Sequence, residues 1–209
     1  MKIKILYFAL CLLLLGNSVE SFSQARFGVK AGVNLANQNY DNFLFEIDSK
    51  MYLSFMAGIV AEFDFSESIG FGTGLQYHGK GVKYDVGVLG EQSVSLNYLQ
   101  VPFQFQFRKN GFFAAVGPYV GFALNGQFDD GATKEDLNFG NGADDDFAAL
   151  DYGAILDIGY QFSNSLRLTG SYSLGLANLI PADALDVPED ASIKNSVIGV
   201  AVTYLFGAN

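Results

Sequence analysis

The sequence predicts an all-β fold, namely an eight-stranded, antiparallel, up-and-down β-barrel that spans a membrane. Three observations lead to this prediction. Stretches that alternate between apolar and polar residues recur along the chain, the gaps between them alternate short and long, and the polar positions are rich in glycine. Tight turns at one rim and longer loops at the other are typical of small transmembrane barrels of the OmpA and OmpX type.

Eight strands are expected. They cover residues 26–36, 50–65, 69–84, 93–108, 112–128, 148–162, 165–178 and 192–206. The short gaps fall near residues 66–68, 108–111 and 163–165, and the long gaps fall near residues 37–49, 85–92, 129–147 and 179–191. Several strands exceed the roughly 9 to 11 residues that cross a bilayer, so we expect their outer ends to project as hairpins. Pro102 and Pro118 fall within strands, and a bulge is expected at each because proline lacks a ladder donor.

The alternation sorts the side chains into two unlike faces. The apolar face includes Phe27, Val29 and Val33 of the first predicted strand. The opposite, polar face includes Gly70 and Gly72 of the third predicted strand. Glycine weakens a strand and adds no solubility, so a glycine-rich face suits water poorly. A narrow eight-stranded barrel leaves little room inside, so we expect the glycines to line the interior and the apolar side chains to face lipid.

Aromatic residues cluster beside the short gaps and at the end of the last strand. They are Phe63, Phe65, Phe71, Phe105, Phe107, Phe112, Phe113, Tyr160, Phe162, Tyr204 and Phe206. Large rings are favoured where a membrane meets water. We therefore expect these rings to form one girdle at the periplasmic interface.

Residues 1–24 are predicted to be a cleaved signal peptide, and residues 25–209 to be the barrel domain. Lys2 and Lys4 provide a positive start, residues 5–15 an apolar core, and residues 21–23 a small-x-small cleavage site. About eleven apolar residues are too few for a membrane-spanning helix, which needs roughly 20. The single cysteine, Cys11, lies in this leader, so disulfides, zinc–thiolate sites and cysteine nucleophiles are excluded from the mature chain.

The charge of the chain argues against nucleic acid as a partner. The chain has 12 basic and 22 acidic residues and a net charge of −10. Without Lys2, Lys4 and Glu20 of the leader, 10 basic and 21 acidic residues remain, a net charge of about −11. Because phosphate contacts require a basic surface, this composition excludes nucleic-acid binding.

Several motifs follow one another along the mature chain. They are F-G-V-K-A-G-V-N-L-A at 27–36, G-F-G-T-G-L-Q-Y-H-G-K-G at 70–81, N-Y-L-Q-V-P at 97–102, G-P-Y-V-G at 117–121, S-Y-S-L-G-L-A-N at 171–178 and T-Y-L-F at 203–206. In this order and spacing the chain resembles the PorT-like outer-membrane β-barrel proteins of the Bacteroidota, also called the porin family. The resemblance implies a small barrel in the cell outer membrane. The member that gives the group its name is tied to type IX protein secretion.

Seven ionisable residues are expected inside the barrel, in its periplasmic half. They are Arg26, Lys30, Glu62, Asp64, Arg108, Asp157 and Arg167. A lone buried charge is costly, so we expect the four cations and three anions to pair and hydrogen-bond. The favoured interpretation is a network that fills and rigidifies the interior. The alternative is a gate that opens a thin ion path when the pairs rearrange.

The longest loop is strongly acidic. Its candidate residues for a divalent cation or a surface contact are Asp129, Asp130, Asp144, Asp145 and Asp146. Hard cations prefer carboxylate oxygens, and such a cation could bridge to lipopolysaccharide phosphates. The loop lacks the alternate-position ligands of a dedicated calcium loop, so a solvated acidic loop is the favoured interpretation and no metal is assigned.

The sequence predicts a non-enzymatic protein without a cofactor. His78 is the single histidine, and no nucleophile or orienting carboxylate accompanies it as a general base requires. We expect a monomer that contacts outer-membrane lipid and lipopolysaccharide and has a structural or interaction role, as an accessory to protein secretion or surface adhesion, with a secretion or envelope protein as partner. One alternative is a narrow, porin-like channel for ions or small solutes. Another is a soluble periplasmic barrel that binds an apolar ligand, which would require the glycine-rich face outward.

Overall fold

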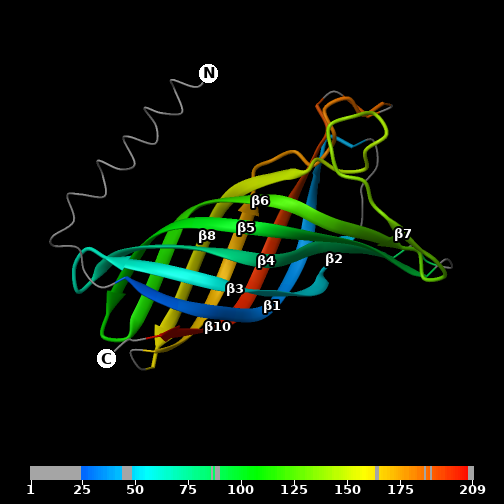
Figure 1. Ribbon diagram of the computed structural model, residues 1–209. Coiled ribbons are helices and arrows are strands. Elements are labelled where there is room, and N and C mark those ends of the chain that lie inside the picture. Colours follow the sequence, from blue (N-terminus) through cyan, green and yellow to red (C-terminus); the bar gives the residue numbers. More distant parts are fainter. Residues whose placement is uncertain are drawn as a thin grey trace, which may run out of the picture.

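A computed structural model describes residues 25–43, 49–85, 87, 90–162, 165–185, 187–188 and 190–206. The predicted signal peptide, residues 1–24, lies outside the described residues. Eight long strands form a ring (Figure 1). They are β1 (Arg26–Asp41), β3 (Tyr52–Asp64), β4 (Ile69–Asp85), β5 (Glu91–Lys109), β6 (Phe112–Asp129), β8 (Leu150–Gln161), β9 (Leu166–Gly175) and β10 (Ser192–Phe206). Two short strands, β2 (Ser49–Lys50) and β7 (Lys134–Asp136), pair with the outer ends of β4 and β6.

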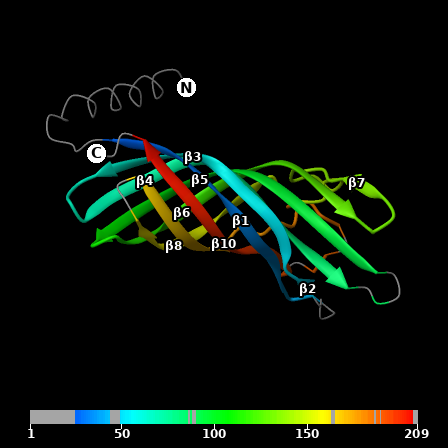
Figure 2. The same ribbon diagram turned by 90° about the horizontal axis from the view of Figure 1, so that it is seen from below.

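The ring is antiparallel and closed. Each long strand pairs with its neighbours in chain order, and β1 pairs with β10 from Phe27 opposite Phe206 to Asp41 opposite Ser192. Figure 2 shows these two strands side by side. Closure leaves no unpaired strand edge along the wall, as a barrel in hydrocarbon requires. The predicted eight-stranded barrel is therefore confirmed. In the described part of the chain, helices of the length and apolarity needed to cross a membrane are absent.

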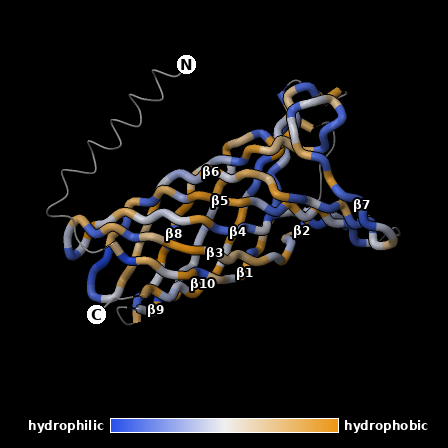
Figure 3. The backbone as a smooth tube through the Cα atoms, in the orientation of Figure 1, coloured by the Kyte–Doolittle hydropathy of each residue, from blue (hydrophilic) through white to orange (hydrophobic). Residues whose placement is uncertain are grey.

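Burial alternates from residue to residue along the strands. Phe27 and Val33 are 57% and 55% exposed, whereas Lys30 and Asn34 between and beside them are buried. The same alternation of hydrophobic and hydrophilic positions runs along the strands in Figure 3. The apolar face therefore points outward and the polar, glycine-rich face lines the bore, which is the arrangement of a barrel surrounded by lipid.

The three short turns and the paired ends of β1 and β10 lie at one rim, which we call the short-turn rim; the opposite rim is the loop rim. Most of the predicted aromatic girdle is exposed around the short-turn rim. The rings more than one-third exposed are Phe63, Phe65, Phe105, Phe107, Phe112, Tyr160, Phe162, Tyr204 and Phe206. Phe113 is an exception, because it is 2% exposed and its ring centroid lies 3.7 Å from the Arg167 guanidinium carbon inside the bore. Its assignment to the girdle is wrong, since adjacent strand residues face opposite sides and Phe112 faces outward.

Neither Pro102 nor Pro118 produces a bulge. Pairing between β5 and β6 lapses after Pro102 and resumes at Phe105 in the same register. The register shift between these strands lies at Asn97–Tyr98 instead. The prediction is wrong because a missing N–H removes a ladder bond without inserting a residue. The Pro102 carbonyl also accepts a hydrogen bond from the Thr73 hydroxyl at 2.8 Å.

Gly117 on β6 leaves no room for a side chain beside β5. A Cβ atom built on Gly117 would lie 1.9 Å from the Phe103 carbonyl oxygen. We expect Gly117→Ala to lower the free energy of unfolding by about 1–3 kcal/mol, measured by urea unfolding in lipid vesicles. Gly170→Ala is the control, because its Cβ would be 3.8 Å from the nearest atom, and it should change stability by less than about 0.5 kcal/mol. Equal losses in the two variants would contradict this packing account.

The outer ends of β4, β5 and β6 extend beyond the barrel and, with residues 137–149, 176–185, 187–188 and 190–193, build a lobe at the loop rim (Figure 1). The lobe has its own hydrophobic core, formed by Val82, Val94, Leu96, Tyr98 and Leu179. Rings and aliphatic side chains from the loops and from the outer ends of β6 and β10 pack against this core, namely Phe128, Leu137, Phe139, Phe147 and Ile193. This packing gives the loop rim a defined structure of its own.

Candidate functional site

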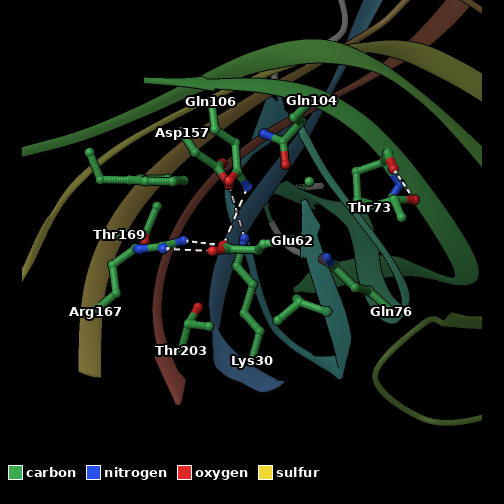
Figure 4. A pocket seen from close by; sticks show the side chains of 14 residues that line it. Lys30, Glu62, Thr73, Gln76, Gln104, Gln106, Asp157, Arg167, Thr169 and Thr203 are labelled. Carbon is green, nitrogen blue, oxygen red and sulfur yellow. Dashed lines mark hydrogen bonds and ion pairs between the residues drawn. The ribbon is translucent and has the colours of Figure 1, made fainter. Parts of the chain in front are cut away.

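Glu62 is the hub of the predicted ionic network. Its side chain is 3% exposed, and β1 places Arg26 directly opposite it in the strand register. Arg26 donates to the Glu62 carboxylate at 3.0 Å. Figure 4 shows that Arg167 donates to both oxygens of this carboxylate, at 2.6 and 3.1 Å. Arg108 and the Gln106 amide donate at 3.4 and 3.3 Å. Three guanidinium groups thus converge on one buried carboxylate, because alternation turns all these side chains inward.

Asp64 and a separate ion pair complete the set. Asp64 lies between Arg26 and Arg108 and pairs with both, with its Oδ2 3.3 Å from Arg26 Nε. Lys30 Nζ lies 3.1 Å from Asp157 Oδ2 and joins β1 to β8 across the bore. The structure therefore brings the seven predicted residues into two adjacent groups. We call the five around Glu62, namely Arg26, Glu62, Asp64, Arg108 and Arg167, the Glu62 cluster.

Residues of the Glu62 cluster and the Lys30–Asp157 pair line one small cavity (Figure 4). Its volume is about 20 Å³, and its walls include Gln104, Thr169 and Thr203. A space of this size accommodates about one water molecule. Side chains therefore fill the bore at this level and leave no passage for a solute.

A second buried ion pair lies nearer the loop rim, and the sequence analysis did not predict it. Lys80 Nζ lies 2.7 Å from Asp151 Oδ2, and both side chains are fully buried. The Lys80 ammonium also lies 4.3 and 5.3 Å from the ring centroids of Tyr119 and Tyr98, within the range of a cation–π contact. The Tyr119 hydroxyl and the Asn195 amide donate to the Asp151 carboxylate at 3.3 and 3.0 Å. We call these five residues the latch.

Strand β4 brings Lys80 into the latch by bending across the bore. Its pairing with β3 stops at His78, and the Gly79 carbonyl instead accepts hydrogen bonds from Asn34 at 3.0 Å and Ser54 at 2.7 Å. Gly81 follows with φ of 143°, a conformation that favours glycine. His78 is itself buried, with its Nδ1 3.3 Å from the Asn34 amide. The single histidine thus belongs to the filling of the bore.

The predicted acidic residues bond within their own turns. Four accept hydrogen bonds or ion pairs there, namely Asp129, Asp130, Asp145 and Asp146. Asp130 accepts the Thr133 N–H at 2.6 Å, Asp145 accepts the Gly142 N–H at 2.8 Å, and Asp144 is exposed. Among the residues that the structure describes, no group of three or more His, Cys, Asp or Glu is placed to hold a metal. The carboxylates therefore order the turns, and the divalent-cation interpretation stays a prediction.

The turn at Asp130 is expected to depend on its carboxylate. Hydrogen bonds from the Thr133 and Ala132 N–H groups hold the pKa of Asp130 below its ordinary value. This stabilisation is complete above the ordinary aspartate pKa and is lost as the pH falls through the lowered one. We expect Asp130→Ala to speed amide hydrogen exchange at Thr133 by about tenfold at neutral pH, with Asp144→Ala as an unaffected control. Unchanged exchange in Asp130→Ala would show that the carboxylate does not hold the turn.

Comparison with known proteins now decides the family. The model of the outer membrane protein beta-barrel domain family matches residues 19–181, which is more than half of the chain. The chain belongs to this family. It is a small outer-membrane β-barrel protein, and this agrees with the outward apolar face and the closed ring. No curated protein matches the chain.

Two solved structures are similar to this chain at low sequence identity. Neisserial surface protein A (NspA) is 11% identical with a TM-score of 0.53, and the alignment covers 87% of this chain and 99% of NspA. Ail, the attachment invasion locus protein of Yersinia pestis, is 13% identical with a TM-score of 0.46, and the alignment covers 88% of this chain and 100% of Ail. At such identity the likeness to NspA shows the fold alone.

Proposed function

We propose that this outer-membrane barrel is a non-enzymatic protein that acts through contacts made by its loop rim. The observation that carries the proposal is the closure of the bore at two levels, by the Glu62 cluster and by the latch. At the level of the Glu62 cluster the lining leaves a cavity of only about 20 Å³. Because the bore of such a barrel is filled, its outer surface and its loops are the parts that can contact other molecules.

The lobe at the loop rim is the proposed contact surface. Its hydrophobic core holds the outer ends of β4, β5 and β6 and the loops in one arrangement, so a partner would meet a preformed surface. Leu185 is 73% exposed and Val187 is 36% exposed in the last loop. Exposed apolar side chains at a loop tip favour contact with another protein over contact with water.

The proposed partner is a secretion or envelope protein, and the proposed role is accessory to protein secretion or to surface adhesion. The resemblance to PorT-like proteins of the Bacteroidota supports the secretion role. Outer-membrane lipid and lipopolysaccharide would surround the exposed apolar belt, and closure of β1 on β10 within one chain supports a monomer. Short turns are usually periplasmic and long loops extracellular, so the lobe would face the outside of the cell.

A pull-down from detergent-solubilised outer membranes tests the proposed role. The wild type and a Leu185→Asp, Val187→Asp double variant are compared, with Asp144→Asn as a control on the same lobe. We expect one partner to be retained by the wild type and the control and lost by the double variant. Retention by all three proteins, or absence of any partner after in-cell crosslinking, would contradict the role assigned to the lobe.

A narrow channel for ions or small solutes is the second candidate function. The observation that favours it is the polar lining of the bore, where glutamine, threonine and paired charges replace the apolar core of a soluble protein. Conduction would require both the Glu62 cluster and the latch to open, and bilayer recordings decide between the two candidates.

A further inference from the structure

The barrel is hollow at its short-turn rim. This hollow has a volume of about 820 Å³ and is lined by the β3–β4 and β5–β6 turns, by residues 160–162 at the end of β8 and by the solvent side of the Glu62 cluster. Arg26, Asp64 and Arg108 form the part of its lining that belongs to the cluster. Polar groups of the turns form much of the rest, including Ser66, Ser68 and Asn110.

The charge at this hollow is opposite in sign to that of the chain, whose net charge is −10. The Glu62 cluster contains three guanidinium groups, on Arg26, Arg108 and Arg167, but only two carboxylates, on Glu62 and Asp64. The two ion pairs deeper in the bore are each neutral. One positive charge is therefore in excess, and it lies beside the hollow.

The remaining charges of the lining leave this excess in place. Lys109 and Glu67 line the hollow as well, and they cancel each other. The excess charge belongs to side chains that are mostly buried, since those of Arg26 and Arg108 are only 13% and 12% exposed. An uncompensated charge at such a site is costly.

Arg108 also retains an unused donor. Its Nε–H group is buried and makes no hydrogen bond within the described structure, whereas Arg26 Nε lies 3.3 Å from Asp64 Oδ2. The planar guanidinium fork matches the paired oxygens of a carboxylate or a phosphate. An anion in the hollow would lie beside the partly exposed side chains of Arg26 and Arg108 and would balance the excess charge.

We propose that the hollow at the short-turn rim binds an oxyanion, a carboxylate or a phosphate, through Arg26 and Arg108. The site opens on the side of the membrane where short turns usually lie, which is the periplasm. Two kinds of ligand could provide such an oxyanion in the periplasm. One is a small free anion, and the other is the carboxylate at the end of a peptide chain.

Titration of the mature barrel in detergent micelles with inorganic phosphate, followed by calorimetry at constant ionic strength, tests the site. We expect Arg108→Gln to weaken phosphate binding about tenfold or more, and Arg108→Lys, which keeps the charge, to weaken it less. Lys134→Gln removes the same charge at the loop rim and should leave binding unchanged. The heat-dependent gel mobility of the folded barrel verifies that each variant has folded.

A second set of titrations distinguishes the two sources. A short peptide with a free C-terminal carboxylate is compared with its amidated form and with acetate. Tighter binding of the acid peptide than of acetate and phosphate supports a peptide ligand, whereas equal binding of the three anions supports a free anion. Absence of binding by all of them, or equal weakening by Arg108→Gln and Lys134→Gln, would overturn the site.

Discussion

Glu62→Gln is expected to lower the free energy of unfolding by about 3–5 kcal/mol. Glutamine keeps the shape of glutamate but removes the charge on which Arg26, Arg108 and Arg167 converge. Three guanidinium groups would then share only the Asp64 carboxylate within the Glu62 cluster. Urea unfolding of the barrel in lipid vesicles, followed by its β-sheet circular dichroism, measures the loss.

Glu67→Gln is the matched control for Glu62→Gln. Glu67 lies at the same rim and carries the same charge, but it is exposed in the β3–β4 turn. Its replacement should change the free energy of unfolding by less than about 0.5 kcal/mol. If the two variants lost equal stability, net charge at the rim and not the buried hub would be responsible.

Lys80→Met is expected to cost about 3–5 kcal/mol of unfolding free energy, because it leaves the Asp151 carboxylate fully buried without its cation. Adding Asp151→Leu should recover most of this loss, since two apolar side chains can replace a buried ion pair at little cost. The same vesicle unfolding assay provides both values and their coupling.

The control for the latch is Lys83→Met on the same strand. Lys83 pairs with Glu91 at 3.5 Å, but its side chain is 37% exposed, so the change should be below about 1 kcal/mol. Additive losses for Lys80→Met and Asp151→Leu would show that the two side chains do not act as a pair. That result would contradict our description of the latch as one interacting group of residues.

The barrel could be predicted from the sequence because its strands alternate with period two, and the strand limits are least accurate where that alternation ends. β1 reaches Asp41 although the prediction stops at residue 36. Beyond Leu35 its outward positions are polar, namely Asn37, Asn39 and Asp41, because the strand has left the apolar belt. Alternation of apolar with polar residues therefore identifies only the part of a strand that lies in the apolar belt.

The Glu62 cluster could be predicted from the sequence, whereas the latch could not. The partners of Glu62 could be predicted because short turns fix the register at that rim, so residues at equal distance from the turns share a level. Lys80 and Asp151 are 71 residues apart on strands that are not neighbours, and β4 bends away from β3 after His78, so no short turn fixes their relative level. Gly79 and Gly81, which flank Lys80, are the sequence signal that could have indicated this bend.

Electrical recording from planar lipid bilayers tests the sealed bore most directly. We predict no discrete current steps for the wild type, and none for the Glu62→Gln, Asp157→Asn double variant, because the latch still closes the bore nearer the loop rim. Discrete, reproducible steps from the wild-type barrel would contradict the account, since they would show that ions pass both the Glu62 cluster and the latch.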